Sequence, residues 1–274
     1  MTNPRKPVPF RVSGVLLAAL VLAGCGVSEP ETKGGPLVSR RISEEQYRTS
    51  IADIFGADIK IGGRFEPEIR ANGLLAVGQS KVTISPTAVE QFEKMGLSIA
   101  DQAVSEARRP SLGCAPADVH APDDACAAKV VQHYGTLLYR RPLADGELAQ
   151  KTALAKAVTA SSGDFYVGLK YALASLLVSP RFLFRHEVAQ AKDGAFRLDG
   201  YSRASRISFF LWNAPPDQEL LDAAGKGELD SAKGLERQVE RLIASPRFEH
   251  GVRAFFSDFM AFDDFDVLAK DPVI

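Results

Sequence analysis

The chain has 274 residues, of which 46% are hydrophobic and 24% are charged, and its formal net charge is -1. This ordinary globular composition excludes a disordered tail protein, a collagen-like chain and a polytopic membrane protein. Because there is no excess of basic residues to neutralise phosphates, nucleic acid is not an expected partner.

Residues 1–24 have the pattern of a bacterial lipoprotein signal peptide. Basic residues precede an apolar run from Val12 to Leu22, which is too short to span a membrane, since a spanning helix needs about 20 such residues. The run ends in Leu22-Ala23-Gly24-Cys25, which resembles the lipobox. We therefore expect Cys25 to be acylated and to hold the protein in the cell envelope. By resemblance to enterobacterial sorting rules, Gly26 favours the outer membrane. A plain secretion signal with a chance cysteine is the alternative.

The sequence after the signal peptide divides by composition. Residues 25–39 are polar, rich in Pro and Gly, and aperiodic, which predicts a flexible tether. The remainder is predicted to form an N-terminal helical module, a cysteine-bracketed loop, a middle helical module and a C-terminal helical module, at 40–110, 111–126, 127–192 and 197–274.

Cys114 and Cys126 form a pair once Cys25 is assigned to the lipid anchor. They bracket a loop without helical or strand periodicity in a chain expected to be exported, so a disulfide is predicted. A metal site with His120 is the alternative. Zinc sites usually have more closely spaced cysteine pairs and four clear ligands, so no metal site is predicted.

From residue 40 onward, apolar residues recur with a helical period and no stretch alternates as a strand would. Ser43 and Gln46 form a capping-box pattern for a helix that Gly56 ends, and Ser85-Pro86 begins the next helix, which runs to Arg109. Further helices are expected at about 130–138, 144–159, 164–178, 180–191, 199–212, 216–224, 232–244 and 246–262. The prediction is an all-α fold, a multi-helix array of antiparallel helices in two or three small packed modules.

Two similar tetrapeptides predict corners between helices. Ser179-Pro180-Arg181-Phe182 and Ser245-Pro246-Arg247-Phe248 each follow an apolar helix. Serine is a good N-cap, proline is favoured at the first helical position, and the residue before proline avoids the helical region. We interpret Arg181 and Arg247 as surface residues rather than ligand clamps.

Three segments resemble a family of uncharacterised exported proteins that are abundant in planctomycetes and often fused to cytochrome c modules. The segments are 40–56 (RRISEEQYRTSIADIFG), 139–143 (YRRPL) with 176–185 (LLVSPRFLFR), and 205–217 (SRISFFLWNAPPD). The resemblance covers roughly residues 40–271 and implies architecture and export, but it supplies no catalytic residues. No Cys-x-x-Cys-His occurs, so covalent c-type haem is excluded, and no cofactor is predicted.

Few residues of this sequence form a pattern that indicates catalysis or ligand binding. The four histidines are scattered, and neither a nucleophile elbow nor a phosphate-binding glycine loop occurs, so no catalytic residue is assigned. Trp212 ends a run of four apolar residues and is expected in the core. A pocket lined by Trp212, Asn213, Asp217 and Arg206 is the alternative. The arginines at 140, 141, 203 and 206 are interpreted either as an anion-binding patch or as partners of nearby carboxylates.

The last aromatic residues are expected to lie on one side of a helix, namely Phe255, Phe256, Phe259 and Phe262, with Phe265 nearby. Such a face needs a substantial partner surface. In the family that the chain resembles, the sequence continues past this point, so we expect an incomplete C-terminal module that exposes part of this face.

The sequence favours a lipid-anchored envelope scaffold or accessory subunit for an extracytoplasmic redox or degradative system. The partners expected are the membrane, through the lipid anchor, and an envelope redox or hydrolase protein. A secreted enzyme subunit acting on an extracellular polymer, with Asp217 and Glu219 as its best candidate carboxylates, is one alternative. A non-covalent haem protein for electron transfer is the other.

Overall fold

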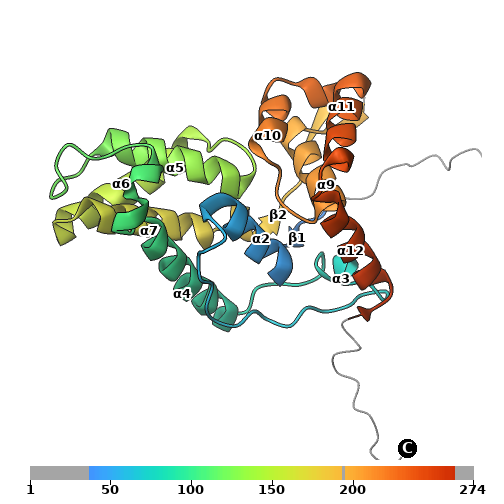
Figure 1. Ribbon diagram of the computed structural model, residues 1–274, viewed down its shortest axis with the longest axis horizontal. Helices are drawn as coiled ribbons and strands as arrows, with labels where there is room; N and C mark the ends of the chain where they lie inside the picture. The colour runs from blue at the N-terminus through green and yellow to red at the C-terminus, as the bar shows by residue number, and fades with distance from the viewer. Residues whose placement is uncertain (1–36, 193–194, 263–274) are drawn as a thin grey trace, which may run out of the picture. The chain divides into compact units, whose positions relative to one another are not determined.

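Helices dominate the computed structural model, which describes residues 37–192 and 195–262, as the apolar periodicity predicts (Figure 1). The first is α2, Glu44–Phe55. Its predicted capping box is present: the Gln46 backbone N–H donates to the Ser43 hydroxyl at 3.0 Å, and the Ser43 N–H donates to the Gln46 side-chain oxygen at 3.1 Å. Gly56 ends the helix with a φ of 112°, a value that favours glycine.

The rest of the N-terminal segment contains a short helix, a long helix and a 3-10 turn. They are α3 (Leu75–Gly78), α4 (Pro86–Ala103) and η2 (Glu106–Leu112). Ser85 caps α4 as predicted, accepting from the Ala88 backbone N–H. The single helix expected up to Arg109 is therefore an α-helix followed by a tighter turn.

The middle segment folds around α7. Its helices are α5 (Asp124–Tyr139), α6 (Asp145–Ser162), α7 (Phe165–Leu177) and α8 (Pro180–Leu183). Helix α7 contacts α4, α5 and α6, so it links the middle segment to the N-terminal one (Figure 1). This is the helix with the largest share of buried apolar residues, which suits its place among three neighbours.

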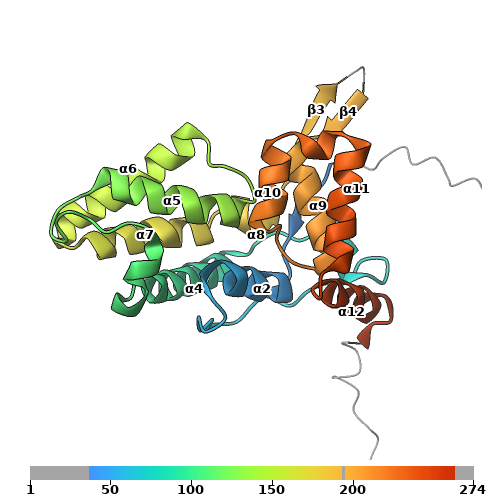
Figure 2. The ribbon, with the colours of Figure 1, turned by 45° about the horizontal axis from the view of Figure 1, so that its top comes forward.

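The expectation of a helix over 180–191 is wrong. Helix α8 ends at Leu183, and β2 (Phe184–Arg185) pairs antiparallel with β1 (Arg40–Arg41). A second ladder joins β3 (Ala189–Lys192) to β4 (Ala195–Leu198) (Figure 2). The first ladder depends on a pairing between distant segments, which local periodicity does not reveal. The second had a local signal, because Asp193-Gly194 is a common hairpin connection.

The C-terminal segment is centred on α9, Gly200–Trp212. The elements around it are α10 (Gln218–Gly225), η3 (Glu228–Asp230), α11 (Ala232–Ala244) and α12 (Phe248–Phe259). Helix α9 contacts all four of them (Figure 2). The predicted corner at 245–248 is present, but Ser245 closes α11 and does not cap α12.

The described residues bury two hydrophobic clusters of unequal size. The larger cluster runs from Ile42 to Leu183 and includes Phe209 of α9, so the N-terminal and middle segments share one core. The smaller cluster lies within the C-terminal segment and is built around Trp212, Leu220 and Leu242. The sequence predicts three helical modules, but the described residues form two cores. Of the three modules, only the C-terminal one has a core of its own.

The predicted disulfide joins Cys114 to Cys126, with their Cα atoms 5.7 Å apart. The bond ties the segment after η2 to the first turn of α5. In the part of the chain that the structure describes, no helix has the length and apolar character needed to cross a membrane. The predicted signal peptide, Cys25 and most of the tether lie outside the described residues, as does Phe265.

Candidate functional site

The predicted pocket residues Trp212, Asn213 and Asp217 lie close in sequence but have separate structural roles. Trp212 is buried in the smaller core, where its indole N–H donates to the Leu242 carbonyl at 2.8 Å. The guanidinium groups of Arg241 and Arg247 lie 5.9 and 4.5 Å from its ring centroid. The indole is therefore held by packing, one hydrogen bond and two cation–π contacts.

Asp217 is the N-cap of α10 and accepts from the Leu220 N–H at 3.0 Å. Its two oxygens also accept from the two Nη atoms of Arg241, at 2.7 and 2.9 Å. Burial raises the pKa of Asp217, but these hydrogen bonds outweigh it, so the net pKa is lowered. Glu219 lies 3.1 Å from the Nε of the same arginine. The two carboxylates named for the enzymatic alternative are thus both paired with Arg241.

Asn213 lies at the end of α9 with a φ of 54°. Its side-chain oxygen accepts from the Gln46 amide at 2.7 Å, and its amide donates to Glu45 at 2.8 Å. Asn213 therefore connects α9 to the first turn of α2. The fourth predicted residue, Arg206, is on an earlier turn of α9 and belongs to a different cluster, described below.

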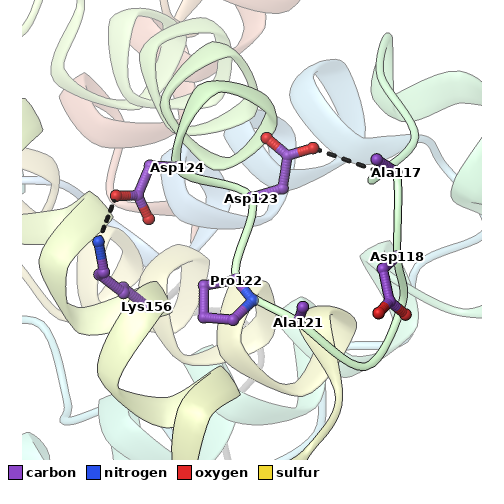
Figure 3. A pocket seen from close by; sticks show the side chains of 7 residues that line it. All are labelled: Ala117, Asp118, Ala121, Pro122, Asp123, Asp124 and Lys156. Carbon is purple, nitrogen blue, oxygen red and sulfur yellow. Dashed lines mark hydrogen bonds and ion pairs between the residues drawn. The ribbon is translucent and has the colours of Figure 1, made fainter.

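A depression of ≈ 680 Å³ lies beside the disulfide-closed loop (Figure 3). Three aspartates line it, but each is already engaged. Asp118 accepts from the His120 N–H, Asp123 accepts from the N–H groups of residues 117 and 126, and Asp124 pairs with Lys156 at 2.7 Å. These carboxylates hold the loop and the start of α5 in place.

Among residues 37–192 and 195–262, no three His, Cys, Asp or Glu side chains converge as metal ligands. His120 lies against the Gly163 carbonyl at 3.1 Å, and His186 is bonded to the Ser39 hydroxyl at 2.7 Å.

A second, mostly apolar depression of ≈ 490 Å³ lies between the start of α4 and the region of α8. Its lining includes Val89 and Phe92 of α4 together with Leu183 and Phe184. It offers apolar contact and one hydroxyl, that of Thr83, so it has the chemistry of a groove for an aliphatic group rather than that of a catalytic centre.

Four arginines lie close together where β1, β2 and α9 meet, and two of them pair with Glu187. We define this arginine cluster as Arg40, Arg140, Arg185 and Arg206. Arg206 forms a two-bond pair with Glu187, at 3.0 and 2.6 Å, and Arg40 reaches the same carboxylate at 3.5 Å. The register of the ladder places Arg40 directly opposite Arg185.

Arg140 is the most deeply buried cation of the cluster. It follows α5 in a left-handed conformation with a φ of 59°, and its guanidinium donates to the carbonyls of residues 138, 181, 182 and 184. Burial lowers its pKa to about 9, and the positive charges of Arg185 and Arg141 act in the same direction. Arg140 therefore stays charged at neutral pH and fixes the turn between α8 and β2.

Arg185 differs from the other members of the cluster because its guanidinium has no hydrogen-bond acceptor among the described residues. Its Nε is buried without a partner, and its charge lies 4.7 Å from the centroid of Phe209. Burial lowers its pKa to about 10, and the charge of Arg40 adds to this effect while that of Glu187 opposes it. The cation is still protonated at neutral pH.

The phenylalanine surface is a second unusual feature. We define it as Phe255, Phe256 and Phe259 of α12 with the adjoining Met260. Their exposed fractions lie between 47% and 60%, and the rings contact one another: Phe255 stacks on Phe259 at 5.9 Å and meets Phe256 edge-on at 5.2 Å. Phe262 is also half-exposed, as the sequence predicts for this face.

An adjoining face of α12 is attached to the rest of the chain. Asp258 accepts from the backbone N–H groups of Leu75 and Ala76 and pairs with Arg70 at 2.9 Å. Gly251 packs so closely on α9 that an added Cβ would lie 2.0 Å from the Leu211 carbonyl oxygen. The helix is thereby held with its phenylalanines turned outward.

Comparison with known families gives three matches in succession. Residues 40–105 match a protein of unknown function (DUF1587), residues 126–187 match DUF1595, and residues 198–273 match DUF1592. The chain contains three consecutive domains of unknown function. Searches of the curated proteins and of the solved structures gave no significant match.

The arginine cluster takes residues from all three domains. Arg40 belongs to the DUF1587 segment, Arg140, Arg185 and Glu187 to DUF1595, and Arg206 to DUF1592. From the sequence we selected Arg206 and considered Arg140, and the pair His186-Glu187 is conceivable as a site, but neither Arg40 nor Arg185 was selected. Arg40 and Arg185 come together only because β1 pairs with β2, and no local sequence signal indicates that pairing.

Proposed function

We propose that this chain is a lipid-anchored scaffold or accessory subunit of the cell envelope that docks a partner protein on its phenylalanine surface. The observation that carries the proposal is the group of three exposed phenylalanines on α12, in which the Phe255 ring contacts both of the others. A contiguous apolar group of this kind, rather than single exposed side chains, is typical of interaction sites.

The way α12 is mounted supports docking. Asp258 and Gly251 attach an adjoining face of the helix to the start of α3 and to α9, so the rings are presented on a fixed element. Side chains that are already positioned lose little conformational freedom on binding, which favours affinity. The charged pair of Glu249 and Arg253 on the same helix supplies a polar edge to the surface.

The anchoring part of the proposal rests on the sequence. The basic segment, the short apolar run and the lipobox at Cys25 together support acylation, and residues 25–39 supply the tether. The resemblance to exported proteins that are fused to cytochrome c modules supports an extracytoplasmic redox or degradative partner, and Gly26 favours the outer membrane.

Fractionation tests the anchor. The full chain is expressed in a Gram-negative host as wild type and as Cys25→Ser, and membranes are separated from soluble periplasmic contents. The expected result is wild type in the membrane fraction with labelled acyl chains, and a variant that lacks the label and leaves that fraction. Equal partition of unlabelled wild type and variant would refute lipid anchoring.

Site-specific photo-crosslinking tests the docking surface. A photoreactive residue replaces Phe259 in one protein and Phe210 in the matched control, since Phe210 is an exposed phenylalanine of α9 outside the surface. In intact cells we expect a discrete crosslinked band with Phe259 alone. That band should be lost when Phe255→Ser is added. Bands of equal strength from both positions, or from neither, would contradict docking on α12.

A further inference from the structure

The arginine cluster carries more positive charge than the single carboxylate within it neutralises. It brings together four guanidinium groups and the single carboxylate of Glu187. Both Arg140 and Arg185 direct their charge toward the Phe209 ring, at 5.9 and 4.7 Å from its centroid. An aromatic face attracts a cation but offers no hydrogen-bond acceptor, so positive charge remains in excess here.

The carboxylate of Glu187 is already committed to other arginines. Its Oε1 accepts from Arg206 Nε and lies 3.5 Å from Arg40, and its Oε2 accepts from Arg206 Nη2 at 2.6 Å. Its side chain is only 9% exposed, so this pairing is fixed by the surroundings. Glu187 therefore lowers the charge of the cluster without supplying an acceptor to Arg185.

Arg185 itself is poorly explained as a packing residue. Partly burying a guanidinium without an acceptor is costly, and an apolar side chain of similar volume would fill the same place beside Phe209 at lower cost. Arg140 shows how this fold satisfies a structural arginine, because four backbone carbonyls surround it. In the case of Arg185, the Nε is the only guanidinium atom that is both fully buried and unpartnered.

We propose that Arg185 is the centre of an oxyanion-binding site at the junction of the three domains, where it binds a carboxylate or phosphate group. The planar guanidinium fork matches the oxygens of either group in a two-bond arrangement. Arg40 and Arg206 supply further positive charge from β1 and α9. Because one arginine comes from each outer domain and Arg185 from the middle one, a bound anion stabilises the junction itself.

The test uses the full chain in detergent, with sodium phosphate and sodium acetate as probes against sodium chloride at equal ionic strength. Calorimetric titration and thermal unfolding report binding. We expect at least one of the two probes to bind and to raise the unfolding temperature. Arg185→Met removes the charge at nearly constant volume, and we expect it to weaken binding about tenfold or more.

Two further variants make the result interpretable. Arg253→Met is the matched control, since this exposed arginine of α12 is outside the cluster, and its anion affinity should equal that of wild type. Glu187→Gln removes the one carboxylate and should tighten anion binding several-fold, which is opposite in sign to Arg185→Met. If Arg185→Met fails to fold, the anion affinity of Glu187→Gln still tests the proposed site.

The proposal is overturned if neither probe binds wild type beyond the chloride control. It is also overturned if Arg185→Met binds as wild type does, or if Glu187→Gln leaves the affinity unchanged or weaker. None of these results bears on the phenylalanine surface of α12, which is tested by crosslinking.

Discussion

The larger and smaller cores are both helical, but they are held together by different means. In the larger one, Tyr47 meets Phe182 and Phe92 with ring centroids 5.3 and 5.8 Å apart, and aliphatic side chains of α5 and α7 fill the remaining space. The smaller core has one tryptophan and few large side chains. Polar contacts join the C-terminal segment to the N-terminal one, such as Arg247 with Asp53 and Asn213 with Gln46, and Phe209 of α9 packs in the larger core.

This difference shows that segments recognised in sequence need not be separate folding units. The DUF1587 and DUF1595 segments share one apolar core, so neither buries its helices alone. The DUF1592 segment has its own core and exposes its phenylalanine surface. Apolar area drives cooperative folding, whereas exposed and partly exposed ion pairs contribute little, so the two cores should be separable by experiment.

The largest expected effect comes from Phe182→Ala. The ring of this α8 residue is fully buried and contacts Tyr47, so its removal should cost about 3–5 kcal/mol of unfolding free energy. Denaturant unfolding is followed by far-UV circular dichroism and by tryptophan fluorescence, because the single tryptophan reports the smaller core. We expect the dichroism midpoint to fall much more than the fluorescence midpoint.

Leu220→Ala is the counterpart in the smaller core. This side chain is also fully buried, so its loss should cost about 2–5 kcal/mol, and here the fluorescence midpoint should move most. If both variants shift both signals equally, the two cores unfold as one unit and the comparison drawn above fails.

Reducing the disulfide should have the next largest effect. The bond closes a loop between residues 12 positions apart, so its loss should cost about 2–4 kcal/mol, through the greater freedom of the unfolded chain. The double variant Cys114→Ala, Cys126→Ala should lower the dichroism midpoint, because α5 belongs to the larger core. Thiol titration of unreduced wild type checks the starting state. An unchanged dichroism midpoint, or one that moves with fluorescence, would argue against this assignment.

Much of this fold follows from local sequence signals. Ser43 with Gln46, Ser85 before Pro86, and Gly56 mark helix ends where the structure has them, because caps and glycines act on adjacent backbone groups. The pairing of Phe184–Arg185 with Arg40–Arg41 could not be predicted in this way, since it joins segments more than 140 positions apart.

The candidate sites were predictable to different degrees. The exposed face of α12 follows from helical spacing, and the disulfide follows from the cysteine count and the expected export. Arg206 was selected for a pocket with Trp212, but it lies with Glu187 instead, because the two residues occupy different faces of α9. Arg185 Nε lacks a hydrogen-bond partner because Glu187 pairs with Arg206, and this pairing follows from the tertiary structure alone.

Gly251→Ala should have a moderate effect that is confined to the C-terminal segment. The added methyl would meet the Leu211 carbonyl at 2.0 Å, so α12 must shift away from α9 at a cost of about 1–3 kcal/mol. The fluorescence midpoint should fall, while the dichroism midpoint should change little. Gly146→Ala in α6 is the matched control, because nothing lies within 4 Å of its added methyl, and it should be neutral or stabilising. A midpoint equal to wild type in Gly251→Ala would mean that the helices are not in close contact.

The smallest expected effect compares two carboxylate–arginine pairs, one in each region. Glu147 accepts from both Nη atoms of Arg141 at 2.8 Å and from the Ala144 N–H at 2.9 Å, much as Asp217 accepts from Arg241 and Leu220. The bond from Arg141 is the main cause that lowers the pKa of Glu147 from 4.5 to about 2. Because the folded pKa is lowered, the stabilisation is complete above about pH 4.5 and is lost as the pH falls toward 2.

Glu147→Gln should therefore cost about 1 kcal/mol at pH 7, since the pair is partly screened by solvent, and should cost progressively less below pH 4.5. Denaturant unfolding from pH 3 to 7, followed by dichroism, measures the difference from wild type. Asp217→Asn should show the same direction in the fluorescence signal, because the pKa of Asp217 is also lowered. A Glu147→Gln penalty that stays constant across this pH range would show that the carboxylate contributes through hydrogen-bond geometry and not through its charge.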